Sequence, residues 1–122
     1  MKYLRIYAGA DGESHFEDVE VALTPTAVYP GIPPLGLSAP HGAAQVIFAR
    51  IPAELRDAGW HTARQRQFVV YLAGETEQEA SDGEIRRVGP GDVILAEDTT
   101  GKGHRSRNLG GEQLVVFIGL GD

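Results

Sequence analysis

Two segments decide the predicted fold, and the first, residues 60–74, reads WHTARQRQFVVYLAG. It begins with an aromatic residue, a histidine and two arginines, and it continues as an apolar run that Gly74 closes. Polar groups at the start of a buried strand either form hydrogen bonds or have a functional role. We therefore expect this segment to supply a strand and part of a site.

The second segment, residues 90–104, reads PGDVILAEDTTGKGH. Here too a turn leads into an apolar strand, and the strand gives way to a polar, glycine-rich stretch that ends in His104. Two segments of this kind in one small chain predict a single site that is built from two neighbouring strands.

Short strands with frequent turns are expected over the rest of the chain. Alternating apolar and polar residues indicate half-buried antiparallel strands, and residues 81–84, SDGE, give a hairpin turn because Asp-Gly supplies the positive φ angles. Such spacing is typical of sandwiches and barrels, so we predict an all-β domain over residues 1–122. The strand at residues 113–120, QLVVFIGL, is predicted to be buried on both faces. The expected strands are residues 2–8, 16–23, 44–51, 67–73, 75–80, 85–88, 93–96, 104–109 and 113–120.

A proline-rich segment, Pro25 through Pro40, interrupts this pattern. Proline lacks an amide donor, so the segment is neither a helix nor an inner strand. We interpret it as an ordered arm that lies along a sheet edge or crosses to a second subunit. Its larger apolar residues are expected to be buried: Val28, Tyr29, Ile32, Leu35 and Leu37.

Composition narrows the classes of partner. The 11 Lys and Arg residues against 17 Asp and Glu give a net charge of −6, which argues against a nucleic-acid partner. The sequence has neither a run of about 20 apolar residues nor an apolar signal-peptide core, so we expect no membrane partner. The absence of cysteine excludes disulfides and thiolate metal sites, and it is compatible with the cytoplasmic location that we predict.

The two segments resemble the motifs of the small single-domain cupins, which belong to the RmlC-like cupin superfamily. In the first cupin motif, G-x5-H-x-H-x3-4-E-x6-G, His61 stands at the first histidine, and Gln67 with Gly74 stands at E-x6-G. His104, preceded by Gly101 and followed by Asn108, reproduces the end of the second motif, G-x2-H-x3-N. The resemblance covers residues 44–120. It implies a double-stranded β-helix (jelly-roll) barrel with an N-terminal strand extension, and a homodimer.

The departures from the motif bear on metal binding. Ala63 stands where the family has its second histidine, and Gln67 stands where it has a glutamate. The resemblance therefore implies a relaxed site of His61, Gln67 and His104 for Zn, Ni, Fe or Mn, which Glu97 or Asp98 could complete. A neutral amide oxygen stabilises a divalent ion little, so a site without metal is the alternative.

His61 and His104 are the predicted acid/base residues, because an imidazole with an ordinary pKa of about 6.5 can give or take a proton near neutrality. Glu97 is a further candidate for general base at the mouth of the barrel, although a solvated loop is the default for Glu97 and Asp98. Gln67 is expected to orient a substrate oxygen. Arg66 is expected to point outward into salt bridges. The other residues predicted to bind substrate are Trp60, Arg64 and Tyr71.

Three functions remain open at this point. The first is an enzyme that performs acid/base chemistry on a small molecule, as a lyase, isomerase, dehydratase or cyclase does. The second is a metal-dependent oxygenase or lyase, and the third is a non-catalytic ligand-binding or sensor protein. A fold of this kind hosts many chemistries and does not select among them.

Overall fold

The computed structural model describes residues 1–121, which form eleven β-strands and no helix. All-β structure was predicted and is confirmed. The strands are β1 (Lys2–Ala8), β2 (Ser14–Glu20), β3 (Thr24–Thr26), β4 (Leu35–Leu37), β5 (Gln45–Ile51), β6 (Gln67–Ala73), β7 (Thr76–Ala80), β8 (Ile85–Val88), β9 (Val93–Ala96), β10 (His104–Asn108) and β11 (Gln113–Gly119).

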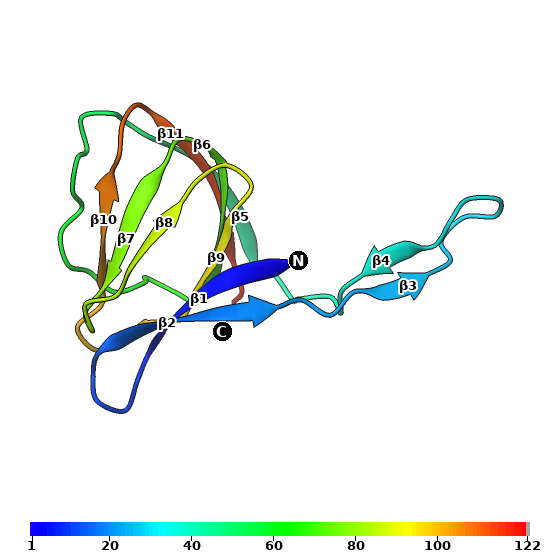
Figure 1. Cartoon of the computed structure of the whole chain (residues 1–122), viewed down its shortest axis with the longest axis horizontal. Coiled ribbons are helices and arrows are strands. Elements are labelled where there is room, and N and C mark those ends of the chain that lie inside the picture. The colour runs from blue at the N-terminus through cyan, green and yellow to red at the C-terminus, as the bar shows by residue number, and fades with distance from the viewer. Residues whose placement is uncertain (122) are drawn as a thin grey trace.

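The strands form two facing sheets and a separate hairpin (Figure 1). The larger sheet has six strands in the order β2-β1-β9-β6-β11-β5, and the smaller has three in the order β10-β7-β8. Neighbouring strands are antiparallel except for β1 and β9, which are parallel. This arrangement is that of a β-sandwich or jelly roll, in which two apolar faces pack against each other.

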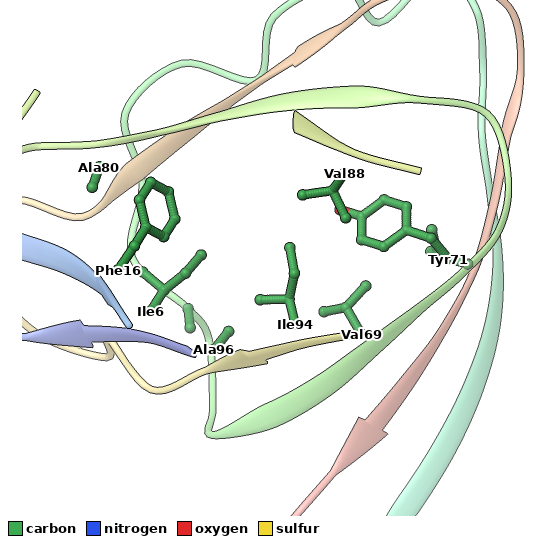
Figure 2. Close-up of a cluster of buried hydrophobic side chains, with 10 residues drawn as sticks. Ile6, Phe16, Val69, Tyr71, Ala80, Val88, Ile94 and Ala96 are labelled. Atoms are coloured by element: carbon green, nitrogen blue, oxygen red, sulfur yellow. The ribbon is translucent and has the colours of Figure 1, made fainter. Parts of the chain in front are cut away.

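The core lies between the two sheets. Val69 and Tyr71 of β6 point toward Ile94 of β9 and Val88 of β8, so strands of both sheets contribute (Figure 2). Residues two apart in a strand share a face, which is why Val69 and Tyr71 are both buried whereas Leu72 on the other face is exposed. The sequence of β6 therefore places its odd-numbered residues between the sheets.

The proline-rich segment forms the hairpin of β3 and β4, which projects from the body of the molecule (Figure 1). Our expectation that it lies along a sheet edge of its own chain is wrong. The five apolar residues that we expected to be buried are all exposed in the single chain, and Tyr29 is 64% exposed. Among the described residues, β3 and β4 form strand pairs only with each other.

The last strand differs from expectation in a related way. Val115 of β11 is buried in the core, but Leu114 is exposed on the other face of the sheet. Burial on both faces was predicted, but within one chain Leu114 on the outer side is exposed and Val116 and Ile118 are only partly covered. Among the described residues there is also no helix long and apolar enough to cross a membrane.

Candidate functional site

A cavity of about 270 Å³ lies between the two sheets and opens to solvent. At about 30 Å³ per water molecule, 270/30 gives room for roughly nine waters, which is the size of a small metabolite. Apolar side chains of the larger sheet, together with Leu55 after β5, form much of its wall: Ile6, Ile51, Leu55, Val69, Ile94 and Phe117. Its polar groups are His61, Thr62, Arg64, Gln67, Tyr71, Thr76, Gln78, His104, Ser106, Asn108 and Gln113.

Backbone pairing brings the two histidines together, as the sequence predicted. His61 and His104 form an isolated antiparallel bridge in which each amide N–H donates to the other carbonyl oxygen at 2.9 Å. Their ring centroids lie 4.6 Å apart. Residues 56–61 thus run along the free edge of β10, with Ala58 N–H bonded to Ser106 O. Two histidines 43 positions apart in number (104 − 61 = 43) become neighbours at one wall of the cavity.

Gly103 makes this close approach possible. Its φ is +79°, a conformation that side-chain-bearing residues rarely adopt, and a Cβ there would lie 2.1 Å from the carbonyl oxygen of His61. The Ser14 hydroxyl donates to the carbonyl oxygen of Gly103 at 2.5 Å, and this bond is buried. The glycine-rich loop therefore holds the backbone of His104 against that of His61.

Each histidine uses its Nδ1 within the protein. Nδ1 of His104 lies 2.6 Å from Oδ2 of Asp98, and Nδ1 of His61 lies 2.8 Å from the carbonyl oxygen of Gly59. Because a carbonyl oxygen and a carboxylate oxygen accept hydrogen bonds, both Nδ1 atoms carry the proton. In the neutral form of each ring, Nε2 then carries the lone pair and is the ring nitrogen available to a bound molecule.

Asp98 is the main residue that the sequence analysis misplaced. A solvated loop was the default, but the side chain is 0% exposed and its Oδ2 accepts from His104. A buried carboxylate behind an imidazole holds the ring in one tautomer and stabilises the positive charge that develops when Nε2 takes a proton. Asp98 is thus positioned to make His104 a general base.

Glu97, by contrast, does not line the cavity. Its carboxylate forms ion pairs with Arg66 and Arg5, with Arg5 Nε 2.5 Å from Oε1. Burial raises the pKa of the Glu97 carboxyl, but hydrogen bonds from Arg66 and Arg5 outweigh burial and hold the pKa below its usual value. The structure therefore does not place the predicted general base at the mouth of the cavity, whereas the expected salt bridge of Arg66 is confirmed.

Tyr71 begins a chain of buried hydrogen bonds along the cavity wall. The Gln78 amide donates to the Tyr71 oxygen at 3.1 Å, and the Ser106 hydroxyl donates to Gln78 Oε1 at 2.7 Å. Burial raises the pKa of Tyr71 to about 12, so its phenol is neutral at physiological pH. Because the phenol oxygen accepts from Gln78, its own O–H points elsewhere and is available to donate to a ligand.

Of the remaining residues that were predicted to bind substrate, some line the cavity and one does not. Gln67 and Arg64 line the cavity, and their binding of a substrate stays a prediction. Trp60 does not: it is 50% exposed, and the guanidinium carbon of Arg105 lies 5.5 Å from the centroid of a Trp60 ring. The sequence analysis missed Gln78 and Ser106, which are brought side by side by the register of β7 and β10.

The donors at the site were tested against the metal that the cupin resemblance implies. His61 and His104 would offer two nitrogen ligands and Gln67 an amide oxygen. Catalytic zinc sites have three protein ligands of the histidine, cysteine or carboxylate type. Within residues 1–121, no group of three or more such side chains comes together to hold a metal ion. The residues present therefore fit a conventional three-ligand site poorly.

The chain is similar in structure to the protein NMB1881 from Neisseria meningitidis. The TM-score is 0.50, and the sequences are 22% identical over 67% of this chain and 77% of that chain. At this level of identity the likeness concerns the fold alone. No protein-family profile and no curated protein sequence matches the chain.

Proposed function

We propose that this chain is a cupin-type jelly-roll enzyme that transfers protons on a small molecule held between its sheets. The observation that carries the proposal is the contact between the buried carboxylate of Asp98 and Nδ1 of His104, at 2.6 Å, beside the cavity. A buried carboxylate and an imidazole with one free nitrogen form the arrangement that general-base catalysis requires.

In the mechanism, Nε2 of His104 takes a proton from the bound molecule, and Asp98 stabilises the imidazolium that results. The neutral phenol of Tyr71 donates a hydrogen bond to the oxygen at which negative charge develops. The proton then returns to another atom of the same molecule in an isomerisation, or leaves with the departing group in an elimination. Reactions of the lyase, isomerase, dehydratase and cyclase types all follow this course.

His61 has a second role beside His104. Its Nδ1–H donates to the carbonyl oxygen of Gly59, which leaves the Nε2 lone pair of the neutral ring for a molecule in the cavity that His61 lines. It can receive a proton from the substrate or hold a water molecule for it. The cupin resemblance and the facing six- and three-stranded sheets support placing this chemistry inside a jelly-roll barrel.

The test compares the wild type with His104→Gln in a cell extract of small metabolites, followed by mass spectrometry. The proposal predicts that the wild type consumes one compound and produces another of equal mass, or of mass lower by water or a small leaving group. His104→Gln, shown to be folded by circular dichroism, is expected to leave that compound unchanged. The same turnover by both proteins would overturn the proposal, and a compound retained by the wild type without turnover would favour a binding protein.

A metal-dependent oxygenase or lyase is the second candidate. It is favoured by the engagement of both Nδ1 atoms, because metal-ligating histidines commonly donate their other nitrogen to a carboxylate or carbonyl oxygen. The donor set counts against it. Metal analysis of untagged protein separates the two: near-stoichiometric Zn, Ni, Fe or Mn, lost in both His61→Ala and His104→Ala, would support this candidate.

A further inference from the structure

We propose that the ligand of the cavity is a small carboxylic acid, and that Arg64 binds its carboxylate. This inference rests on the proposed function and names its substrate class. Arg64 lies on the segment that leads into β6, where it is exposed and is one of the residues that line the open cavity. In this proposal Arg64 binds the carboxylate of the ligand, and the apolar wall of the cavity binds its hydrocarbon part.

The distribution of charged residues between the cavity and the rest of the chain supports an anionic ligand. The chain has 17 acidic residues and a net charge of −6, but none of the described residues that line the cavity is Asp or Glu. Arg64 and the two histidines supply the ionisable nitrogen at its wall. The carboxylate beside the cavity, that of Asp98, is engaged by His104, so a lining that holds an arginine and no carboxylate provides a site for an anion.

The other arginines show that Arg64 is unusual. Ion pairs with Asp or Glu occupy Arg5, Arg50, Arg66, Arg86, Arg87, Arg105 and Arg107. In the part of the chain that the structure describes, Arg64 and Arg56 form no such pair. Of these two, Arg64 lines the cavity and Arg56 does not. Arg64 therefore has its full hydrogen-bonding fork free for a ligand carboxylate.

A carboxylate fits this site better than a phosphate does. No lysine and no second arginine lines the cavity within the described residues, and a phosphate would bring about two negative charges against one guanidinium. The apolar wall of Ile51, Leu55 and Phe117 accommodates a hydrocarbon body. Arg64 and His104 line the same cavity, so an acid bound at Arg64 shares that cavity with His104.

The experiment measures binding by ligand-observed NMR and calorimetry. The probes are hexanoate, benzoate and 2-oxohexanoate, each beside its own primary amide, which has the same shape without the charge. The wild type is expected to bind at least one acid about tenfold or more tightly than its amide. Arg64→Gln is expected to lose this preference, and Arg56→Gln, the matched control, to keep it.

Two results would overturn the inference: no acid binds more tightly than its amide, or the preference survives in Arg64→Gln. Because the measurement is of binding, it is independent of turnover. Preference for acids without any turnover in the extract experiment would reject proton transfer alone. Turnover of a neutral compound, with no preference for acids, would reject the role of Arg64 alone.

A separate observation supports a second inference, about the outer face of the larger sheet. We define this outer face as the side of β5, β11 and β6 that points away from the core. Two rows of paired residues cross it, Phe48–Val116–Val70 and Val46–Ile118–Phe68. Phe48 is 80% exposed, and Val46, Leu72 and Leu114 are exposed as well. Strands that are apolar on both faces are typical of sheets that are covered on both faces.

We infer that a second copy of this chain covers the outer face and the projecting hairpin of β3 and β4. Residues 21–49, which include the hairpin and most of β5, contain no Asp, Glu, Lys or Arg in a chain that is 23% charged. Two exposed, uncharged surfaces therefore lie next to each other in one chain. In a two-fold dimer each surface of one copy can pack on a surface of the other, so both are buried at once.

The edge strand β5 is where the two-fold axis of such a dimer can lie. β5 ends the order of the larger sheet, so one side of its backbone has no strand beside it in the described residues. Exposed apolar edge strands tend to pair with another strand, and an antiparallel pairing of β5 with its copy satisfies two-fold symmetry. The hairpin, which precedes β5 directly, then lies against the partner.

Sedimentation and light scattering of the full chain test this inference. The wild type is expected to be a dimer at micromolar concentration, and Phe48→Asp is expected to weaken association by about a hundredfold or more. Ile85→Asp is the matched control, because Ile85 is 50% exposed but lies on β8 of the smaller sheet. Tyr29→Asp in the hairpin gives a second test, because its side chain is exposed and its loss leaves the core intact.

Association is read together with circular dichroism, so that an unfolded variant is recognised. If Phe48→Asp does not fold, Tyr29→Asp decides the question. A monomeric wild type would overturn the inference, even if the outer face captured some other protein. A dimer that survives both Phe48→Asp and Tyr29→Asp would overturn it too.

Discussion

Glu97 and Asp98 are consecutive in the chain, yet their carboxylates serve opposite sides of the larger sheet. Glu97 reaches the outside and pairs with Arg5 and Arg66, whereas Asp98 is buried and contacts His104. This follows from strand geometry, because successive side chains point to opposite faces. The Glu97 carboxylate therefore links β1 to the segment before β6 through its ion pairs, whereas the Asp98 carboxylate belongs to the candidate site with His104.

Asp98→Asn is expected to abolish most of the turnover while leaving the shape of the site unchanged. An amide at this position can donate to Nδ1 of His104, which reverses the tautomer and protonates Nε2. We expect kcat to fall by about 10²–10⁴-fold, with a smaller change in KM. Steady-state kinetics with the compound found in the extract experiment measures this. A kcat within about twofold of wild type would show that Asp98 is structural.

Glu97→Gln is expected to have the converse effect, lowering stability and sparing turnover. Loss of the ion pairs with Arg5 and Arg66 should cost about 1–2 kcal/mol of unfolding free energy at neutral pH, because one partly buried charge network is broken. Since the folded pKa of Glu97 lies below 4.5, its contribution is present above about pH 4.5 and is lost as the pH falls through the folded value.

Urea unfolding of wild type and Glu97→Gln across this pH range measures the difference. The stability gap is expected to close in acid. A gap that stays constant with pH would mean that the effect of Glu97 is not electrostatic.

Gly103→Ala is expected to lower the stability of the fold and to break the backbone pairing of His61 with His104. The positive φ costs about 1–2 kcal/mol for a residue with a side chain, and the added Cβ would also lie 2.1 Å from backbone of His61. Gly83→Ala is the control, because Gly83 has a φ of +98° but its Cβ would meet nothing within 4 Å. Thermal unfolding should show a clearly larger loss for Gly103→Ala, and equal losses would contradict the steric argument.

His15 gives a pH-dependent contact between two parts of the fold. Its Nδ1 lies 2.8 Å from Asp82 in the turn after β7, and its Nε2 lies 3.1 Å from Asp11. The hydrogen bond to Asp11, together with that to Asp82, raises the pKa of His15 above 6.5 against the opposing effect of burial. The contacts of protonated His15 with Asp11 and Asp82 therefore stabilise the fold below about pH 6.5. This contribution is lost as the pH rises through the pKa of His15 in the folded state.

His15→Gln tests that sign. The wild type is expected to be more stable than the variant at pH 6, and the difference is expected to shrink as the pH rises above 6.5. A difference that grows with pH would contradict the assignment. The measurement is chemical unfolding at constant ionic strength, because the exposed carboxylates are sensitive to salt.

Local patterns in the sequence were enough to predict nine of the eleven strands, but not β3 and β4 in the proline-rich segment. β6 begins and ends at the predicted residues, Gln67 and Ala73, because a run of β-branched and aromatic residues is closed by Gly74. The hairpin turn at residues 81–84 also lies between β7 and β8 as predicted, since Asp-Gly specifies it. The pairing of His61 with His104 was anticipated from the two motifs and not from any local pattern.

The inward direction of Asp98 was within reach of the sequence but was missed. Ala96 is a core residue, and the two-residue period of a strand carries Asp98 to the same side and Glu97 to the other. We weighted the polar and glycine-rich context instead, which favours a solvated loop. Gln78 and Ser106 were out of reach, because only the register between β7 and β10 brings them together.

The exposed hairpin of β3 and β4 shows a second limit of prediction from the sequence. Apolar residues in the Pro25–Pro40 segment predict burial, but a sequence does not say in which molecule the burial takes place. Local composition identifies a surface that avoids water, and the geometry of the fold then decides whether the same chain can cover it. Here the hairpin projects from the body, so its own chain does not.

The central claim is that Asp98 fixes His104 with its proton on Nδ1 and a lone pair on Nε2, and the histidine side-chain nitrogens report this directly. Two-dimensional ¹H–¹⁵N NMR correlations through two bonds distinguish the two tautomers without any substrate. The account predicts a protonated Nδ1 and an unprotonated Nε2 for neutral His104 in the wild type, with the preference lost or reversed in Asp98→Asn. A wild-type His104 with its proton on Nε2, or a tautomer unchanged in Asp98→Asn, would contradict it.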